Sequence, residues 1–301
     1  MLKYLVSARG IAATFGTCAA LFLAPSGGAN ASALLFNDFS NLTGLQLNGN
    51  TSSIHSCTGG VGSTCSAVTD SHNHNVLRLT NSTGQAGSVF STTAISLDQN
   101  ASFSTSFQFH FRDQQNGGAD GIVFALQTVS NTAGGAGGGI GYAGLSNSVG
   151  IEFDNWNNGV IDGNSDNHVG INIGGDVSSV ALETNPGFAL DSGDLITAWV
   201  DYDGTTDELE VRANTTGIRP GSAMLSYTVD LVQELGATDA FVGFTSGTGF
   251  AGADHDIVAW QFNSEFNPIN TIGVPEPGTL AVIGFGLLGM GIARRRAHRV
   301  A

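Results

Sequence analysis

The middle of the chain is a succession of short segments in which apolar and polar residues alternate, separated by clusters of Gly, Asn, Ser and Asp. Alternation with a period of two is typical of strands that bury one face, and the separating residues favour turns. In residues 103–111, four phenylalanines lie an even number of residues apart, so they share one strand face, which must be buried. These patterns, with a short helical turn fitting only residues 229–235, predict an all-β protein, a single β-sandwich over residues 34–267. The expected strands are residues 44–47, 76–80, 103–111, 121–127, 149–154, 168–173, 195–202, 209–212, 223–227, 240–245 and 256–262.

The charge of the chain excludes nucleic acid as a partner. The 301 residues include 10 Lys and Arg against 25 Asp and Glu, a formal net charge of -15. Six of the ten basic residues lie near the two ends, and the region between them contains only Arg78, Arg112, Arg212 and Arg219, and no lysine. A protein that follows a phosphate backbone needs a basic stripe, which this region lacks. Because 41% of the residues are hydrophobic, the chain can bury a core and is not a disordered acidic tail.

Residues 1–33 have the organisation of a secretory signal peptide. Two basic residues precede an apolar run over residues 11–23, and the small-residue sequence Ala31-Ser32-Ala33 provides a cleavage site. The apolar run is too short to cross a membrane, and glycines follow it, which argues against a first helix of the folded domain. We expect the mature chain to begin near Leu34.

The C-terminal residues 274–301 contain Pro275-Glu276-Pro277, then an apolar segment over residues 280–293, then three consecutive arginines. An apolar helix before an arginine cluster orients the preceding domain away from the cytoplasm, although this one is short for a permanent span. This order resembles the PEP-CTERM sorting signal of Gram-negative bacteria. The resemblance implies transient anchoring in the inner membrane, cleavage near the prolines by an exosortase, and release to the cell surface or matrix. The alternative is permanent anchoring by the helix, and residues 268–273 are expected to be a linker.

The cysteines agree with export. Cys18 lies in the expected signal peptide, which leaves Cys57 and Cys65 in a segment rich in Gly, Ser and Thr. Two cysteines in an oxidising compartment most simply form one disulfide. A zinc site with His72 and His74 is the alternative, but the cysteines are not the close pair that zinc sites use.

Residues 149–173 concentrate the polar chemistry of the chain. Glu152, Asp154 and Trp156 share one strand face by the period of two, so two carboxylates are held side by side. After a loop, the next strand begins with His168 on its polar face, and a hairpin would fold this histidine back onto the two carboxylates. Adjacent carboxylates repel each other unless a proton or a cation lies between them.

The loop between these strands supplies further oxygen donors. Two carboxylates with a histidine suit a transition ion such as Mn²⁺, and carboxylates with amide and carbonyl oxygens suit Ca²⁺. The alternative is a solvated acidic loop that holds no metal. The donors in the loop are Asn158, Asp162, Asn164 and Asp166.

Residues 149–158 have the sequence Val-Gly-Ile-Glu-Phe-Asp-Asn-Trp-Asn-Asn, and Asp162 and an Asn-His-Val-Gly-Ile segment at residues 167–171 follow. This combination resembles the metal-binding loop of legume-type (L-type) lectins. Other stretches match this family in the same order, between about Leu42 and Phe262. The resemblance implies a concanavalin A-like jelly-roll, a β-sandwich of two antiparallel sheets, in an exported, non-enzymatic carbohydrate-binding protein. The matching stretches are residues 103–109, 118–126, 137–141, 200–203, 242–249 and 255–262.

The resemblance also implies the metal ligands. The family places the fourth calcium carboxylate five residues before the histidine, where this chain has Gly163. We therefore expect Asp162 to ligate with a shift of one residue, and Asp166 is the competing candidate. The other implied ligands are Glu152, Asp154 and His168 for Mn²⁺, and Asp154, the carbonyl of Trp156 and the side chain of Asn158 for Ca²⁺.

The implied sugar site surrounds the calcium ion. Asp120 matches the aspartate that accepts hydrogen bonds from sugar hydroxyls, and in the family the peptide bond before it is commonly cis. Gly138 matches the glycine whose N–H donates to the sugar, where a side chain would block the approach. Asn158 would donate its amide, and Trp156 would stack on the apolar face of the ring unless it is a core aromatic. Trp199 and Trp260 are assigned to the core.

We expect the protein to bind glycans, with exopolysaccharide of the matrix as one possible class of partner. One alternative is a structural matrix or adhesion protein that has the lectin fold without sugar affinity. Another is a jelly-roll glycoside hydrolase, which also carries a Glu-x-Asp pair on a concave strand. A retaining hydrolase needs a second catalytic acid near Trp156 or Asn157, and neither residue can donate a proton.

Overall fold

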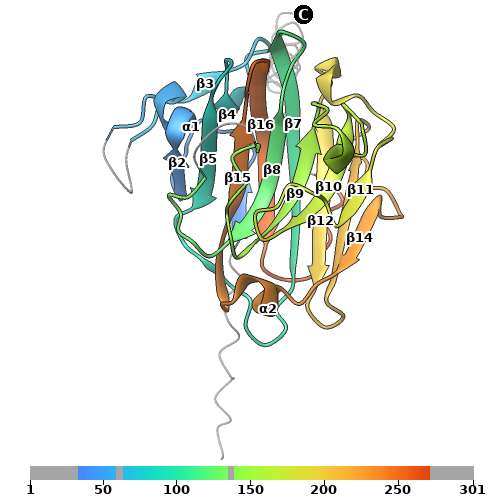
Figure 1. Ribbon diagram of the computed structural model, residues 1–301. Helices are drawn as coiled ribbons and strands as arrows, with labels where there is room; N and C mark the ends of the chain where they lie inside the picture. The colour runs from blue at the N-terminus through green and yellow to red at the C-terminus, as the bar shows by residue number, and fades with distance from the viewer. Residues whose placement is uncertain (1–32, 59–63, 135–138, 272–301) are drawn as a thin grey trace, which may run out of the picture. The chain divides into compact units, whose positions relative to one another are not determined.

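The computed structural model describes residues 33–58, 64–134 and 139–271 (Figure 1). The sorting signal lies outside the described residues, as do Gly138 and all but the last residue of the expected signal peptide. Among the described residues, no helix has the length and apolar character needed to cross a membrane.

Two antiparallel eight-stranded sheets form the structure, and we name each after one of its strands. The β7 sheet has the order β14-β13-β12-β7-β16-β4-β3, with β1 paired to β16, and the β9 sheet has the order β11-β10-β9-β8-β15-β5-β2, with β6 paired to β15. The all-β prediction with two antiparallel sheets is confirmed. The β7 sheet comprises β1 (Ala33–Phe36), β3 (Val68–Thr69), β4 (Asn75–Thr80), β7 (Phe103–Gln115), β12 (Ile196–Asp203), β13 (Glu208–Asn214), β14 (Leu225–Thr228) and β16 (Gly252–Asn263). The β9 sheet comprises β2 (Leu45–Asn48), β5 (Ala86–Ser91), β6 (Ile95–Ser96), β8 (Gly121–Gln127), β9 (Ser148–Asp154), β10 (His168–Ile173), β11 (Ala181–Glu183) and β15 (Asp239–Gly247).

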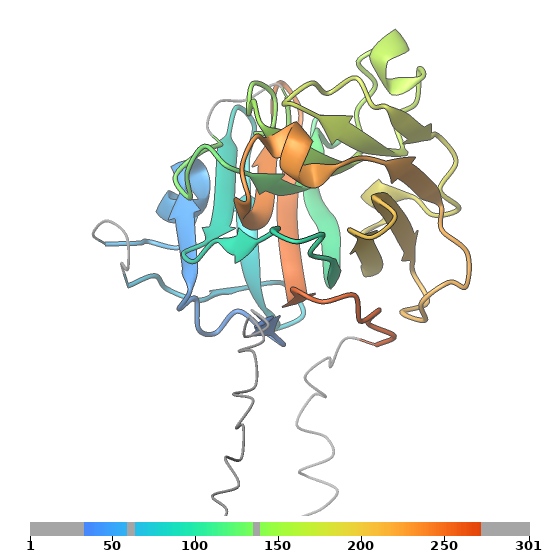
Figure 2. The ribbon, with the colours of Figure 1, turned by 90° about the horizontal axis from the view of Figure 1, so that it is seen from below.

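The helical elements are short. The helix α2 (Leu231–Leu235) falls within the predicted turn of helix at 229–235, and the side chain of Asp230 caps it by accepting a hydrogen bond from the backbone N–H of Gln233. It lies at the bottom of the sandwich in Figure 1 and in front of the strands in Figure 2, which is seen from below. The remaining elements are α1 (Gly49–Ile54) and the 3₁₀ turns η1 (Val160–Asp162) and η2 (Leu190–Ser192).

Aromatic side chains fill the space between the sheets. All four phenylalanines of β7 are fully buried, as their even spacing predicts. The ring of Phe107 contacts three rings of the β9 sheet, those of Phe124, Phe153 and Phe244, at centroid distances of 5.7, 5.8 and 5.0 Å. Burying a side chain of this size contributes about 2 to 3 kcal/mol, so this cluster is a main source of stability.

The two tryptophans assigned to the core are both fully buried, but in different places. Trp260 belongs to the cluster between the sheets and contacts Phe244. Trp199 alternates with the core residues Ala198 and Val200, so it lies on the other face of the β7 sheet. Trp199 is therefore buried, as expected of a core residue, but it does not lie between the two sheets.

All eleven predicted strands are present, and β8 and β10 have the predicted bounds. The pattern missed β1, β3, β5, β6, β11 and the helix α1. The sequence of β5, Ala-Gly-Ser-Val-Phe-Ser, shows no alternation of apolar and polar residues, and all six residues are buried. At Gly87, a Cβ would lie 2.1 Å from Thr51 Oγ1 of α1, so this strand needs a glycine where α1 covers it. Cys57 and Cys65, which follow α1, are joined by a disulfide with an S–S distance of 2.01 Å.

Candidate functional site

The hairpin of β9 and β10 brings the polar residues of both strands together. His168 lies opposite Asp154, and Gly170 lies opposite Glu152. Directly paired residues point to the same face, so the histidine and both carboxylates share the face away from the core. The register follows from the alternating pattern of each strand, because a slip of one residue would turn Phe153 and Val169 out of the core.

Four ionisable side chains converge on this face. His168 Nε2 lies 3.3 Å from Glu152 Oε1, 4.0 Å from Asp154 Oδ2 and 4.0 Å from Asp162 Oδ1. Each of the four residues is at most 3% exposed. Asp154, Asp162 and His168 each offer a ligand atom within 4.8 Å of the others, a spacing that suits a metal ion.

The loop places Asp162 in this cluster and leaves Asp166 outside it. Asp162 ends the turn η1, and its carboxylate accepts a hydrogen bond from the backbone N–H of Asn158. Gly163 and Asn164 then adopt positive φ angles of 61° and 60°, which turn the chain back toward β10. Asp166 is exposed to solvent. The loop therefore places Asp162, and not Asp166, beside Asp154 and His168.

The electrostatics of the cluster fit a bound cation. Burial and the Glu152 charge raise the pKa of Asp154 well above its usual range, and burial also raises the pKa of Asp162. Both ring nitrogens of His168 are buried without a hydrogen-bond partner. Three carboxylates and an imidazole with free nitrogens are a donor set that Ca²⁺ and transition ions accept, and these residues therefore fit the two metals that the family generally binds.

Asp120 lies beside this cluster, at the start of β8. The Ala119–Asp120 peptide bond is cis, and Gly121 pairs with Asp154. The backbone of Asp120 is held on both sides, because its N–H donates to Gly247 O at 3.1 Å and its carbonyl accepts from the N–H of Asn155 at 2.9 Å. Burial and the Asp162 charge raise the pKa of Asp120 to about 6. Its Oδ2 atom is buried without a hydrogen-bond partner.

Asn158 and Trp156 complete the part of the predicted sugar site that the structure describes. Asn158 is exposed at the mouth of the site, and Trp156 is partly exposed, so Trp156 is not a core aromatic. The N–H of Trp156 donates to Asp154 Oδ1 at 2.6 Å, which fixes the loop against β9. Gly138, the fourth predicted sugar-binding residue, is outside the described residues.

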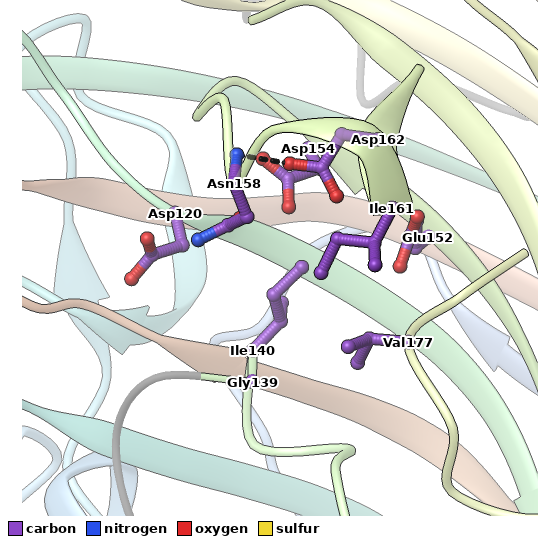
Figure 3. Close-up of a pocket in the computed structure, with 9 residues that line it drawn as sticks. All are labelled: Asp120, Gly139, Ile140, Glu152, Asp154, Asn158, Ile161, Asp162 and Val177. Atoms are coloured by element: carbon purple, nitrogen blue, oxygen red, sulfur yellow. Dashed lines mark hydrogen bonds between the residues drawn. The ribbon is translucent and has the colours of Figure 1, made fainter. Parts of the chain in front are cut away.

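A pocket lies beside the acidic residues of this cluster (Figure 3). Its volume is about 140 Å³. In Figure 3, three aliphatic side chains, those of Ile140, Ile161 and Val177, point into the space beside the acidic ones. The lining residues are Asp120, Gly139, Ile140, Glu152, Asp154, Asn158, Ile161, Asp162 and Val177.

Sequence reasoning missed two residues that hold Glu152. The amide of Asn172 donates to Glu152 Oε2, and the hydroxyl of Ser179 donates to Oε1 at 3.0 Å. Ser179 Oγ also lies 2.7 Å from Asn172 Oδ1. The alternation of β10 could have identified Asn172, which shares the face of His168 and Gly170. Ser179 lies in the loop after β10, where no sequence pattern indicates its neighbour.

This combination of a two-sheet sandwich and an acidic hairpin site matches a known family. The family profile "Legume lectin domain" matches residues 63–276, more than two thirds of the chain. The chain therefore belongs to the legume lectin family. The profile "PEP-CTERM protein-sorting motif" matches residues 273–297. This motif implies export by membrane sorting, and the two matches together support an exported lectin-like protein.

Similar proteins come from plants. Agglutinin-2 of Cladrastis kentukea is 33% identical over 175 residues, which cover 54% of this chain and 58% of the agglutinin. The L-type lectin-domain containing receptor kinase VIII.1 of Arabidopsis thaliana is 32% identical over 171 residues, 55% of this chain and 24% of the kinase. The matches thus span about a quarter of the kinase and just over half of the agglutinin.

Solved structures share the fold over nearly their whole length. The basic winged bean lectin with Tn-antigen has a TM-score of 0.61 and 27% identity, and the alignment covers 78% of this chain and 98% of that lectin. The winged bean acidic lectin complexed with methyl-α-D-galactose has a TM-score of 0.61 and 25% identity, over 79% and 99% of the two chains.

Proposed function

We propose that this protein is an exported lectin that binds glycans at a shallow site organised by Ca²⁺ and Mn²⁺. The observation that carries the proposal is Asp120, which lines the pocket and whose buried Oδ2 has no hydrogen-bond donor. A buried carboxylate oxygen without a donor is unfavourable, and sugar hydroxyls are donors of the required kind. The winged bean lectins that share this fold are complexed with sugar ligands, which agrees with this use of the site.

The metal ligands follow from the donor set. Glu152, Asp154 and His168 would hold Mn²⁺, with Ser179 and Asn172 orienting Glu152. Asp154, Asp162, the side chain of Asn158 and the carbonyl of Trp156 would hold Ca²⁺. When bound, the cations would supply the positive charge that the buried carboxylates lack. Asn158 and Asp120, which line the same pocket, would then bind one sugar.

The sugar contacts divide by chemistry. Asp120 accepts hydrogen bonds from hydroxyl groups, whereas the amide of Asn158 and the backbone N–H of Gly138 donate them. The ring of Trp156, which is partly exposed beside Asn158, stacks on the apolar face of the pyranose. Such a shallow site binds a monosaccharide weakly, so several copies on one surface would provide the useful affinity.

Export places this site where polysaccharides are found. After removal of residues 1–33, the sorting motif directs the chain to an exosortase, which cleaves near Pro275–Pro277 and releases the domain to the cell surface or the matrix. Transient anchoring in the inner membrane precedes this cleavage. At the cell surface or in the matrix, the released lectin would bind exopolysaccharide or mediate surface adhesion.

A glycan array probed with the purified domain tests the proposal. We expect binding that is lost in chelator and returns when Ca²⁺ and Mn²⁺ are added. Binding that is indifferent to chelator, or no binding to any glycan, contradicts the proposal; the second result would indicate a structural protein with the lectin fold.

A pair of matched variants tests the ligand assignment. Asp162→Asn should abolish metal-dependent binding, whereas Asp166→Asn, with the same change of charge in the same loop, should leave it intact because Asp166 is exposed. Loss of binding only in Asp166→Asn would show that the calcium carboxylate is misassigned.

The relatives in the lectin family support a non-enzymatic role. A retaining glycoside hydrolase needs a second carboxylic acid beside the first, and the positions expected for it hold Trp156 and Asn157. Hydrolysis of β-glucan that Glu152→Gln abolishes would instead establish an enzyme.

A further inference from the structure

Three asparagines of this chain are followed directly by glycine, at residues 48–49, 116–117 and 158–159. Asparagine is thermolabile, because the backbone nitrogen of the next residue can attack its side-chain carbonyl carbon. A glycine in the next position has no Cβ to hinder this attack. All three pairs lie within the described residues, and their surroundings differ, so their reactivities should differ as well.

Asn48 is restrained at both reacting groups. Its side-chain amide donates to Asn131 O at 2.9 Å and to Ser88 Oγ at 3.1 Å. At Gly49, a Cβ would lie 2.6 Å from Ala86 O, so the backbone of β5 closes the space beside the attacking nitrogen. We therefore expect Asn48 to react most slowly of the three.

Asn116 is open at its glycine but restrained at its amide. The side chain is exposed, and its amide donates to Phe250 O at 2.8 Å. At Gly117, a Cβ would meet no atom within 4 Å. The reaction must break the hydrogen bond to Phe250 before the side chain can turn toward the nitrogen, which slows it.

Asn158 is open at both groups. Its side chain is exposed and extends toward Asp120 (Figure 3), and within the described ranges no group forms a hydrogen bond with it. At Gly159, a Cβ would meet no atom within 4 Å, so a ring has room to form there. The N–H of Gly159 donates to Asn157 Oδ1 at 2.7 Å, but this bond is exposed and water can replace it.

Few contacts hold the loop around Asn158. The backbone N–H of Asn158 donates to the carboxylate of Asp162, and the amide of Asn157 donates to Asn164 O at 2.8 Å. Asp162 belongs to a group of carboxylates that repel each other when no cation lies between them. Segments with exposed residues and few buried contacts open locally at a low cost in free energy. Without metal, the side chain and the Gly159 nitrogen can therefore reach each other.

We infer that Asn158 is a deamidation site and that bound metal protects it. The inference rests on the proposed function, in which the side-chain oxygen of Asn158 is a calcium ligand. Ligation restricts the rotation of the amide that the attack requires, so only the metal-free fraction of the protein reacts. The Asn-Gly pair thereby limits the lifetime of the site in surroundings that lack the metal.

The reaction consumes one water and releases one ammonia. The Gly159 nitrogen loses its proton to solvent and bonds to Asn158 Cγ, and the side-chain nitrogen leaves as ammonia. Water then opens the resulting ring at either carbonyl, which yields aspartate or isoaspartate at position 158. Both products lose the NH₂ group that would donate to a sugar, and both add a carboxylate to a pocket that four carboxylates already line.

Peptide mapping by mass spectrometry tests the inference on the purified exported protein, incubated at neutral pH in chelator or with Ca²⁺ and Mn²⁺. In chelator, we expect Asn158 to convert several-fold faster than Asn116, and Asn48 to remain intact longest. Metal at about a hundred times its Kd should slow conversion at Asn158 about a hundredfold, because about 1% of the protein stays metal-free. The rate at Asn116 should not change.

Denatured protein provides the structural control, because all three pairs should react at similar rates once the fold is lost. A ranking that persists in denaturant overturns the inference, as does conversion at Asn158 that is no faster than at Asn116 in chelator. Equal conversion at Asn158 with and without bound metal also overturns it. Calorimetry on the same samples shows whether the metals bind, and if they do not, the proposed function fails as well, so the two failures are distinguishable.

A pair of variants tests the consequence for the site. Asn158→Asp makes one of the two products directly and should lose metal-dependent glycan binding. Asn116→Asp makes the same change of charge at an exposed residue that does not line the pocket, and it should bind glycans like the wild type. Equal glycan binding by the two variants would show that conversion does not inactivate the site, which overturns the inference.

Discussion

Two groups of buried acidic residues lie on opposite sheets of this protein. The site cluster on the β9 sheet consists of Asp120, Glu152, Asp154 and Asp162 with His168. The arginine network on the β7 sheet consists of Asp70, Asp254 and Asp256 with Arg78, Arg112 and His110. Both groups are removed from water to a similar degree, but only the second has cations of its own.

The pKa values reflect this difference. Burial raises the pKa of each of Asp120, Asp154 and Asp162. Burial acts on Asp256 too, but hydrogen bonds from Arg78 and His110 outweigh it and lower the pKa. Asp254 is the exception, because burial and the Asp256 charge outweigh Arg78 and raise its pKa to about 7. Breaking a buried ion pair is destabilising because it leaves an uncompensated charge, whereas buried acids without an internal cation must take up a proton or an external cation.

Asp256→Asn should cause the largest loss of stability. The substitution leaves the guanidinium of Arg78 buried beside a neutral amide, and it replaces one of the two oxygens that face Arg78 and His110 with an NH₂ group, which cannot accept a hydrogen bond. We expect the free energy of unfolding to fall by about 3 to 5 kcal/mol in chemical denaturation. Glycan binding should persist while the protein is folded, and a variant as stable as the wild type would show that the network is not structural.

Asp154→Asn should weaken metal and glycan binding without reducing stability. It removes a charge from the site cluster, so the metal-free protein should be at least as stable as the wild type. Binding of Mn²⁺, measured by calorimetry, and metal-dependent glycan binding should fall by about a hundredfold or more, because both proposed metals share this carboxylate. A large loss of stability in the metal-free variant would instead show that Asp154 stabilises the fold, as we expect of Asp256.

The carboxylates with raised pKa values and those with lowered pKa values should oppose each other as the pH changes. Raised pKa values mean that the folded protein holds protons that the unfolded chain has released. Without metal, the stability should therefore increase as the pH falls through about 7 and about 6, where Asp254 of the arginine network and Asp120 of the site cluster titrate. The lowered pKa values of Asp70 and Asp256 stabilise the fold above about pH 4, and this stability is lost as the pH falls further.

Thermal unfolding in chelator between pH 3 and 8 should therefore show greatest stability near pH 4 to 6, with a gain over pH 7 of about 1 to 2 kcal/mol. Added Ca²⁺ and Mn²⁺ should stabilise the protein most at pH 7, because protons compete for the same ligands at lower pH. A metal-free protein whose stability increases steadily from pH 5 to 8 would contradict this account of the site cluster.

Ser179→Ala should have the smallest of these effects. It removes the hydroxyl that donates to Glu152 Oε1, and we expect Mn²⁺ affinity to fall about tenfold with little change in stability. The control is Ser178→Ala, at the exposed neighbouring residue, which should behave like the wild type. Equal affinities for the two variants would exclude a role for Ser179 in positioning Glu152.

Strands in which apolar and polar residues alternate were predictable because their pattern is local. The period of two in β9 and β10 identified both strands, their faces and the meeting of His168 with two carboxylates. The pattern failed for β5, whose sequence does not alternate, and for α1, which has no apolar stripe and is held through Thr51, whose hydroxyl donates to Leu79 O. Contacts with distant segments determine these elements, and no local pattern reports such contacts.

Some residues of the candidate site were likewise predictable from a local pattern, and others were not. Its ligand types and their spacing are properties of one hairpin, so the sequence alone was sufficient to propose Glu152, Asp154 and His168. The choice of Asp162 over Asp166 depends on how the loop turns at Gly163, and the support of Glu152 by Ser179 depends on a second loop. Tertiary structure also brings Gly249 beside Asp120, through the pairing of β15 with β8, and pairs the four arginines of the described residues with carboxylates. The reason is physical: side-chain alternation follows from the covalent geometry of a strand, whereas contacts between loops exist only once the sheets have packed.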